Sequence, residues 1–221
     1  VRVRDSRDIK AHLPMISITG VGSGTATPEG YQRDPALVIN FYNERRKQLL
    51  KVKPNRGHEL LAELEKNFHV TVVTQNIDNL HERAGSSHII HLHGELTKVC
   101  SSRDPHNPHY IKELKPEEYE VKMGDKAGDG TQLRPFIVWF GEAVPEIETA
   151  IQYVEKADIF VIIGTSLNVY PAAGLLHYVP RGAEVYLIDP KPVDTHTSRS
   201  IHVIQKGASE GVAELKQLLG V

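Results

Sequence analysis

Three polar side chains, Asn76, Asp78 and His93, stand where a ligand could be oriented and a proton moved. Asn76 and Asp78 come just after the apolar, β-branched run at 70–73, with Thr74 and Gln75 between. Parallel α/β sheets present ligand-binding residues at the carboxyl ends of their strands. A histidine near its ordinary pKa takes a hydroxyl proton at neutral pH, which makes His93 a candidate general base. The alternative for His93 is a structural imidazole.

Other histidines close to His93 raise the alternative of a metal site. His91 would share a face with His93 on an extended segment, and His88, His106 and His109 lie nearby in the sequence. Their spacing matches no tight ligand motif, and no carboxylate completes a recognisable triad. A histidine metallohydrolase is therefore a hypothesis without a convincing ligand set.

A second pair of polar side chains lies on a helix that Asp34 can cap and Pro35 can begin. Tyr42 and Arg45 are three residues apart on this helix and share one face. Spacing alone favours a partly buried tyrosine beside a solvated arginine. The functional alternative is a phenol and a guanidinium that together bind a carboxylate.

The elements that position these residues are short apolar runs alternating with helical patterns, which predicts an α/β fold with a doubly wound parallel sheet. Strands are expected at Val70–Thr74, Ile159–Gly164, Ala183–Ile188 and Ile201–Gln205, and helices at Gly57–Lys66, Glu146–Lys156, Ala172–Tyr178 and Glu210–Leu219.

Small or polar residues follow several of these strands. Gly164, Thr165 and Ser166 follow the second strand and Asp189 follows the third, while a further strand at 16–20 opens into a turn that contains Gly20 and Gly22. Glycines let a backbone approach a phosphate, although a single glycine-rich turn is weak evidence. Together the four strand ends favour a nucleotide ligand.

Two regions, 26–51 and 97–133, depart from the alternation and predict a smaller inserted module. The run from Arg134 to Glu142 then predicts a strand that ends in an aromatic residue and a glycine. A core strand is the simpler interpretation, and an edge that pairs with an extended peptide is the alternative.

Composition limits the class of protein. The chain has 221 residues, a formal net charge of −2 and a single cysteine, Cys100. The net charge argues against binding held mainly by phosphate contacts to nucleic acid, and no apolar run is long enough to span a membrane. One cysteine excludes an internal disulfide and fits a reducing compartment. These features predict a soluble, cytoplasmic protein, with residues 1–15 as a leader of uncertain status.

Taken together, the motifs resemble the sirtuin family of NAD-dependent protein deacylases, especially its bacterial CobB-type members. The matching segments occur in the family's order and are 74–78, 93–95, 138–142 and 164–171. The resemblance implies a Rossmann-like NAD-binding domain, formed by 16–25, 52–96 and 134–221, with 26–51 and 97–133 as the inserted module. It also implies a monomer whose cofactor is NAD and whose partners are acyl-lysine proteins or peptides.

The resemblance assigns His93 as the base that draws a proton from a ribose hydroxyl after the acyl oxygen has displaced nicotinamide. The NAD-binding residues would be Gly20, Gly22, Gln75, Asn76, Asp78, Gly164, Thr165, Ser166, Asp189, Gly207 and Ala208. The substrate-binding residues would be Ala26, Tyr42, Arg45, Val138, Phe140, Gly141 and Glu142. Ala26 would leave room for a longer acyl chain whose carboxylate Tyr42 and Arg45 bind, which implies desuccinylase and demalonylase activity beside deacetylation.

Two departures from the family pattern qualify this expectation. Cys100 stands about where the first of four zinc-binding cysteines would fall and has no cysteine partner, so no zinc is expected. The long cofactor loop that normally follows the glycine turn is also missing between Gly22 and Ala26. The alternative function is therefore a sirtuin-fold module that binds NAD or peptide with little or no catalysis.

Overall fold

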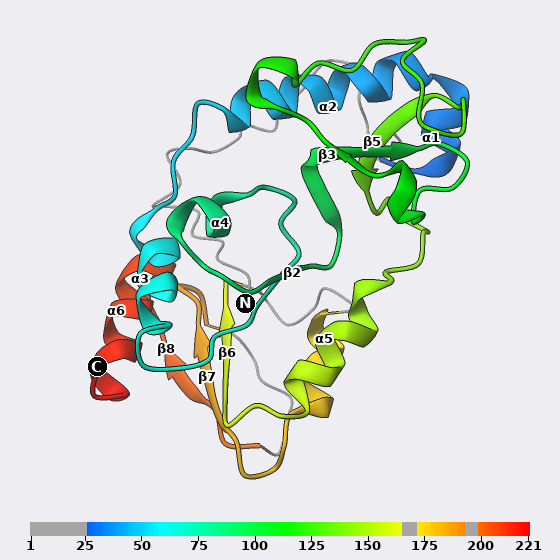
Figure 1. Cartoon of the computed structure of the whole chain (residues 1–221). Helices are drawn as coiled ribbons and strands as arrows, with labels where there is room; N and C mark the ends of the chain where they lie inside the picture. Colours follow the sequence, from blue (N-terminus) through cyan, green and yellow to red (C-terminus); the bar gives the residue numbers. More distant parts are fainter. Residues whose placement is uncertain (1–25, 165–171, 193–198) are drawn as a thin grey trace.

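The computed structural model describes residues 26–164, 172–192 and 199–221 (Figure 1). The leader at 1–15 and the expected strand at 16–20 with Gly20 and Gly22 lie outside the described residues, and so do Thr165 and Ser166. Among the helices of the described part, none combines the length and the apolar character that a membrane span requires.

Five strands form two parallel sheets. β1 (Val72–Thr74) pairs with β2 (Ile89–His91), while β7 (Glu184–Ile188) lies between β6 (Ile159–Ile163) and β8 (His202–Ile204). Four of these strands were expected and are slightly shorter than predicted. The parallel pairing confirms the α/β class.

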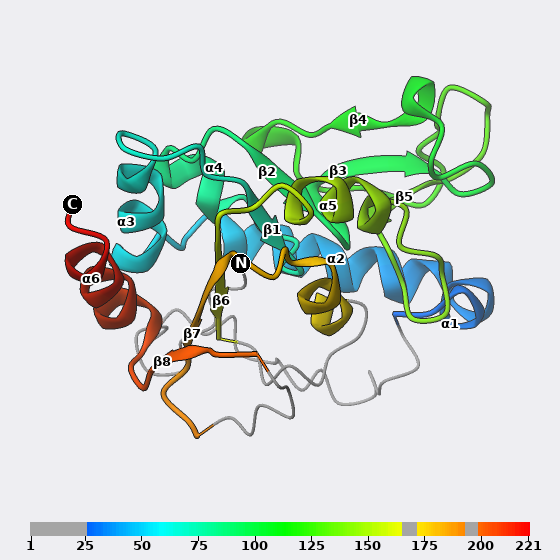
Figure 2. The same cartoon turned by 90° about the horizontal axis from the view of Figure 1, so that it is seen from below.

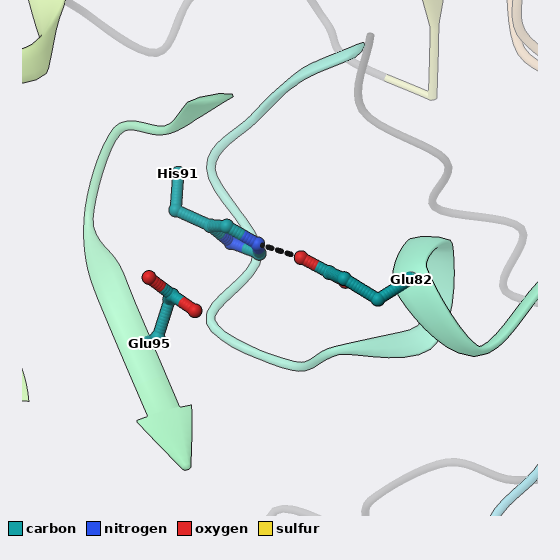
Figure 3. A group of neighbouring side chains, drawn as sticks. All are labelled: Glu82, His91 and Glu95. Carbon is teal, nitrogen blue, oxygen red and sulfur yellow. Dashed lines mark hydrogen bonds and ion pairs between the residues drawn. The ribbon is translucent and has the colours of Figure 1, made fainter. Parts of the chain in front are cut away.

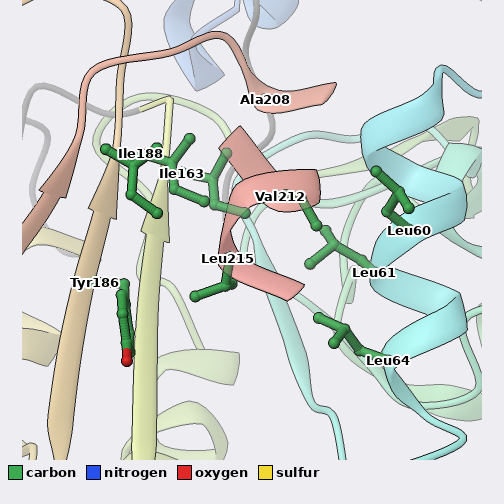
Figure 4. Packing of buried hydrophobic residues seen from close by; sticks show 10 residues of the cluster. Leu60, Leu61, Leu64, Ile163, Tyr186, Ile188, Ala208, Val212 and Leu215 are labelled. Carbon is green, nitrogen blue, oxygen red and sulfur yellow. The ribbon is translucent and has the colours of Figure 1, made fainter. Parts of the chain in front are cut away.

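Helices cover both faces of the β6–β7–β8 sheet, because alternate residues of a strand point to opposite sides. Ile163 and Ile188 pack against α3 (Arg56–Leu64) and α6 (Ala208–Leu218) (Figure 4). Their neighbours Ile162 and Leu187 face α5 (Glu146–Val154) and the segment η3 (Ala172–Tyr178) on the other side. The segment η3 is a 3₁₀ helix.

A third sheet is antiparallel and packs on α1 (Pro28–Arg33) and α2 (Pro35–Leu49). Its central strand β3 (Gly94–Ser101) pairs with β4 (Lys112–Glu113) on one side and β5 (Leu133–Ile137) on the other. Between β3 and β5 the chain also forms the 3₁₀ turns η1 (Pro108–Tyr110) and η2 (Pro116–Glu118). Figures 1 and 2 place this sheet and α2 together, away from β6–β8. The sheet contains both 97–101 and 94–96, so it crosses a predicted module boundary.

Helix α2 begins as its sequence predicts. The Asp34 carboxylate accepts a hydrogen bond from the Leu37 amide at 2.9 Å, and Pro35 occupies the first helical position, where a missing N–H costs nothing. Val38, Ile39, Tyr42, Arg46 and Leu49 are buried and mark the face turned towards the antiparallel sheet.

Candidate active site

The segment after β1 is held in place by its own side chains. The Thr74 hydroxyl, which is fully buried, accepts a hydrogen bond from the Asn76 amide at 3.0 Å. Two residues on, Asp78 accepts one from the Leu80 amide at 3.1 Å, where α4 (Leu80–Ala84) begins. Such local bonds favour a tight turn over a continued strand. Asn76 and Asp78 are therefore delivered at the carboxyl end of β1, as expected from the sequence.

Two histidines contact successive carbonyl groups of this segment. His93 Nδ1 lies 3.2 Å from the Gln75 oxygen, and His91 Nδ1 lies 3.2 Å from the Asn76 oxygen. A carbonyl oxygen only accepts, so each Nδ1 carries the proton and donates it. When the His93 ring is neutral, this tautomer leaves the lone pair on Nε2, which is the form that a general base requires.

His91 is bound at both ring nitrogens. Its Nε2 lies 2.6 Å from Glu82 on α4 (Figure 3). Burial alone would lower the pKa of His91, but the hydrogen bond and charge of Glu82 outweigh burial and raise it. Burial would likewise raise the pKa of Glu82, and its bond to His91 lowers it instead. His91 and Glu82 therefore form an ion pair, and the same His91 ring contacts the Asn76 carbonyl.

Glu95 lies beside this ion pair, and the ligand atoms of Glu82, His91 and Glu95 are within 4.8 Å of one another. That arrangement could in principle hold a cation. Each group already has a protein partner, however, because Glu95 accepts a hydrogen bond from Lys98 at 2.6 Å. The cluster is thus a neutralised network of ion pairs.

The chain turns sharply between His93 and β3. Gly94 has a φ of +77°, and a side-chain carbon there would collide with the Phe136 carbonyl oxygen. The same close approach lets the Val138 amide donate to the His93 oxygen at 3.0 Å. Gly94 therefore brings the segment after β5 alongside the candidate base.

The expected substrate-binding segment continues from this point. The Phe140 amide bonds the Ala26 oxygen at 3.1 Å, and the Phe140 side chain is 77% exposed. Gly141 follows with a positive φ. Val138, Phe140 and Gly141 thus form a turn that starts beside His93 and ends on an exposed aromatic ring.

Glu142 is bonded within the protein. Its two oxygens receive a bidentate pair from Arg134, at 2.9 and 3.0 Å, and one of them also accepts the Trp139 amide at 2.8 Å. The Arg134 guanidinium lies 3.5 Å from the centre of the Trp139 ring. Neither Arg134 nor its role was expected from the sequence. These contacts of Arg134 with Glu142 and Trp139 stabilise the 138–142 turn.

Tyr42 is buried, while Arg45 is half-buried on the same face of α2. The Trp139 indole donates to the Tyr42 oxygen at 3.1 Å, which leaves the phenol proton to be donated elsewhere. Burial raises the pKa of Tyr42 to about 12, so it stays protonated. The Arg45 guanidinium lies 5.1 Å from the centre of the Phe41 ring. Ala26 packs against the apolar cluster that contains Tyr42 and Trp139.

The remaining cofactor candidates lie at the carboxyl ends of β6, β7 and β8. Gly164 follows β6, and its amide donates to Ile188 at 2.9 Å. Asp189 follows β7 and accepts the Lys191 amide at 2.8 Å, while Gly207 and Ala208 begin α6 after β8. Adjacent parallel strands present these residues at one edge of the sheet.

Comparison with known proteins agrees with this arrangement. The model of the Sir2 family matches residues 22–171. A Bacteroides thetaiotaomicron protein named NAD-dependent protein deacylase is 94% identical over 194 residues, which cover 88% of this chain and 83% of that protein. A Helicobacter pylori protein of the same name is 47% identical over 190 residues, covering 86% and 80%.

Solved structures give the same result. A complex of a Sir2 homologue with NAD has a TM-score of 0.77 at 33% identity, and the match covers 90% of this chain and 77% of that one. A Sir2 structure with a p53 peptide and NAD⁺ has a TM-score of 0.71 at 28% identity, covering 88% and 82%. The chain therefore belongs to the Sir2 family, the sirtuins.

Proposed function

We propose that this protein is an NAD-dependent deacylase of protein lysines that releases nicotinamide and an O-acyl-ADP-ribose. The observation that carries the proposal is His93, whose Nδ1 donates to the Gln75 carbonyl and whose Nε2 is the basic nitrogen. It stands beside the turn that carries Asn76 and Asp78. The relatives named above as deacylases, and the Sir2 complexes with NAD and with peptide, support the same activity.

The residues present fit NAD as co-substrate, which supplies an electrophilic ribose carbon and nicotinamide as the leaving group. Asn76 and Asp78 would contact the nicotinamide half, and Gln75 the ribose hydroxyls. The rest of the dinucleotide would lie on the carboxyl ends of β6–β8, along Gly164, Asp189, Gly207 and Ala208. Gly20, Gly22, Thr165 and Ser166 complete the set by resemblance alone.

The peptide would enter beside the 138–142 turn, where Val138, Phe140 and Gly141 offer backbone groups next to His93. Holding the acyl-lysine and NAD together makes their reaction effectively unimolecular, which lowers the barrier by several kcal/mol. The regions 26–51 and 97–133 would act as the smaller module, without zinc, in a monomer.

Nicotinamide release tests the activity directly. The protein is incubated with NAD and an acetyl- or succinyl-lysine peptide, and nicotinamide is measured by mass spectrometry. We expect peptide-dependent release that falls by about 10²–10⁴-fold in His93→Ala, because a general base contributes that much. His69→Ala, at an exposed histidine, is the matched control. NAD or peptide binding without turnover in the unaltered protein would instead support a binding module.

The acyl preference depends on Tyr42 and Arg45. A phenol proton donor and a cationic fork on one helix face suit the distal carboxylate of succinyl- or malonyl-lysine. We expect Arg45→Met to lose about 10–100-fold in desuccinylation and much less in deacetylation, because hydrogen bonds to charged groups contribute about 1.5–3 kcal/mol. Lys47→Met, on the exposed side of α2, should change neither. Equal losses on both peptides would contradict the assignment.

A further inference from the structure

We propose that His91, held by Glu82, is a positioning residue for NAD binding: it fixes the Asn76 carbonyl and thereby the direction of the Asn76 side chain. The inference rests on the proposed function, in which Asn76 contacts the nicotinamide half of NAD. His91 would act through Asn76 and not by contact with the co-substrate. Its ring lies between the turn after β1 and helix α4, with Nδ1 3.2 Å from the Asn76 oxygen and Nε2 2.6 Å from Glu82.

The end of β1 and the turn that follows are bound along their length by the chain that runs from β2 into β3. The carbonyl groups of residues 74–77 each accept a hydrogen bond from that second segment. Backbone amides bond the two outer carbonyls, with Leu92 donating to Thr74 at 2.9 Å and Leu96 to Ile77 at 2.7 Å. Histidine rings bond the two inner carbonyls. The middle of the turn is therefore held by side chains, and a substitution can remove its contacts one at a time.

The two contacts of His91 fix the charge of its ring. In the ion pair the Glu82 carboxylate accepts, and so does the Asn76 carbonyl, so both ring nitrogens carry a proton and the ring is a cation. The His91 side chain is 7% exposed, so water screens this pair weakly. Without Glu82, a neutral ring is free to place its single proton on Nε2 and to release the Asn76 carbonyl.

The neighbouring charges leave the His91 ring committed to these two partners. Glu95 lies beside the ring on β3 and is a possible competitor for its protons (Figure 3). Lys98 bonds Glu95 at 2.6 Å, which gives that carboxylate a cation of its own. Two negative and two positive groups therefore balance, and no unpaired carboxylate draws the ring away from Asn76.

The backbone of Asn76 is held on both sides of its α-carbon. Its amide donates to the Thr74 hydroxyl at 3.0 Å, and its carbonyl accepts from His91. These two bonds together fix the direction in which the side chain leaves the backbone. Loss of the His91 contact loosens the peptide group between residues 76 and 77, and a misplacement of about 1 Å in a group that orients a reactant lowers the rate by about 10²-fold.

Two substitutions separate the contacts of the His91 ring. An asparagine amide lies about where Nδ1 does, so His91→Asn keeps a donor for the Asn76 carbonyl and loses Glu82. A glutamine amide reaches the place of Nε2, so His91→Gln keeps Glu82 and loses the Asn76 carbonyl. Isothermal titration calorimetry of the full chain with NAD compares them. We expect the dissociation constant to rise about tenfold or more in His91→Gln and to stay within about threefold of the unaltered protein in His91→Asn.

Steady-state kinetics with NAD and an acetyl-lysine peptide give a second readout. In His91→Gln the KM for NAD should rise about tenfold while the KM for the peptide stays unchanged. The 138–142 turn, where the peptide would bind, is bonded through His93 and Ala26 instead. A merely structural role of His91 would weaken the binding of NAD and peptide together. His88→Leu removes another half-buried histidine, one that stacks on Tyr153, and should change neither constant.

Glu82→Ala keeps the proposal testable if a His91 variant fails to fold, because Glu82 is exposed and its truncation leaves the ring in place. It should raise the NAD dissociation constant about threefold or more, since the ring loses its charged partner. Equal NAD dissociation constants in His91→Asn and His91→Gln, or equal rises in the two KM values, would overturn the proposal. With the His91 variants unfolded, an unchanged constant in Glu82→Ala would do the same.

The same measurements distinguish this proposal from the deacylase activity. NAD binding without turnover in the unaltered protein would contradict the activity alone, because the order of the NAD dissociation constants among the variants still decides the role of His91. An unaltered protein that binds no NAD would overturn both.

Discussion

His91 and His93 are two residues apart, yet they do different work. Each contacts one carbonyl of the turn at 75–76 through Nδ1, and His93 is the one that we propose as the general base. The second nitrogen of His91 is bound to Glu82, which turns that ring into a charged support for Asn76. One histidine is thus suited to exchange a proton, and its neighbour is suited to hold the backbone.

The His91–Glu82 pair makes stability depend on pH. The raised pKa of His91 gives stabilisation that is complete below its unfolded value of about 6.5 and is lost as pH rises through the folded value. The lowered pKa of Glu82 gives stabilisation that is present above about 4.3 and is lost as pH falls. Glu82→Gln should therefore lower the melting temperature more at pH 5.5 than at pH 8.5.

Thermal unfolding of both proteins at the two pH values measures this difference. Glu65→Gln is the control, because Glu65 bonds Ser87 and no histidine is involved. Its effect should be the same at both pH values. A Glu82→Gln effect that also stays constant, or grows towards pH 8.5, would show that the pair does not form as described.

The sequence was sufficient to predict that Asn76 and Asp78 lie at the carboxyl end of β1. In parallel sheets, short polar side chains that follow a buried strand lie at the edge where ligands bind. The role of His91 was missed, since Glu82 lies nine positions away and no periodicity connects a helix residue to a strand end. Arg134 was missed for a similar reason. A charged residue at the start of an apolar strand is expected to be exposed. Arg134 is buried instead, because Trp139 packs on its guanidinium and Glu142 forms an ion pair with it.

At the scale of elements, β3 begins at the turn that places the candidate base. Gly94 combines a positive φ with a backbone contact that a side chain would block. We expect Gly94→Ala to destabilise the protein by about 2–5 kcal/mol, which combines the left-handed conformation with overpacking. Urea unfolding measures the change.

Gly85 is the matched control for Gly94. Its φ is +101°, but a side-chain carbon there would meet only the Ala62 methyl, at 3.9 Å. Gly85→Ala should therefore cost about 1–2 kcal/mol, from the backbone conformation alone. Equal losses at the two positions would contradict the close approach between β3 and β5.

Sequence patterns identified the elements whose apolar residues form either a continuous run or a stripe on one helix face. The apolar strands of β6 and β7 and the capped helix α2 were found, because burial on two faces or a stripe on one face leaves a visible pattern. Strand β2 and the sheet formed by β3, β4 and β5 were less visible. β2 and β4 are very short, and β4 consists of exposed Lys112 and Glu113, which a loop would show equally well.

At the scale of the whole molecule, Cys100 reports on how the antiparallel sheet opens. It is the single cysteine of the chain and is fully buried on β3, and burial raises the pKa of its thiol to about 12. A thiol reagent at pH 8 should therefore label the native protein very slowly, and labelling should accelerate with urea as the sheet opens.

A variant with Cys100→Ser and Arg103→Cys is the control, because residue 103 is exposed beyond the end of β3. It should label at the rate of a free thiol without urea. Native Cys100 labelling at that same rate would show that the sheet opens far more easily than its burial implies. The comparison therefore measures the stability of the antiparallel sheet, whose central strand begins next to the candidate base.

Strand β3 begins at the residue directly after the candidate base. His93 is tied to the Gln75 carbonyl beside the parallel β1–β2 sheet, and the next residue already belongs to the antiparallel sheet. If the antiparallel sheet and α2 rotate when a peptide binds, with Gly94 as the pivot, the end of β3 at Ser101 travels furthest and His93 hardly moves. A substrate could thus be gripped by a large displacement at the periphery while the distance over which the proton is transferred stays constant.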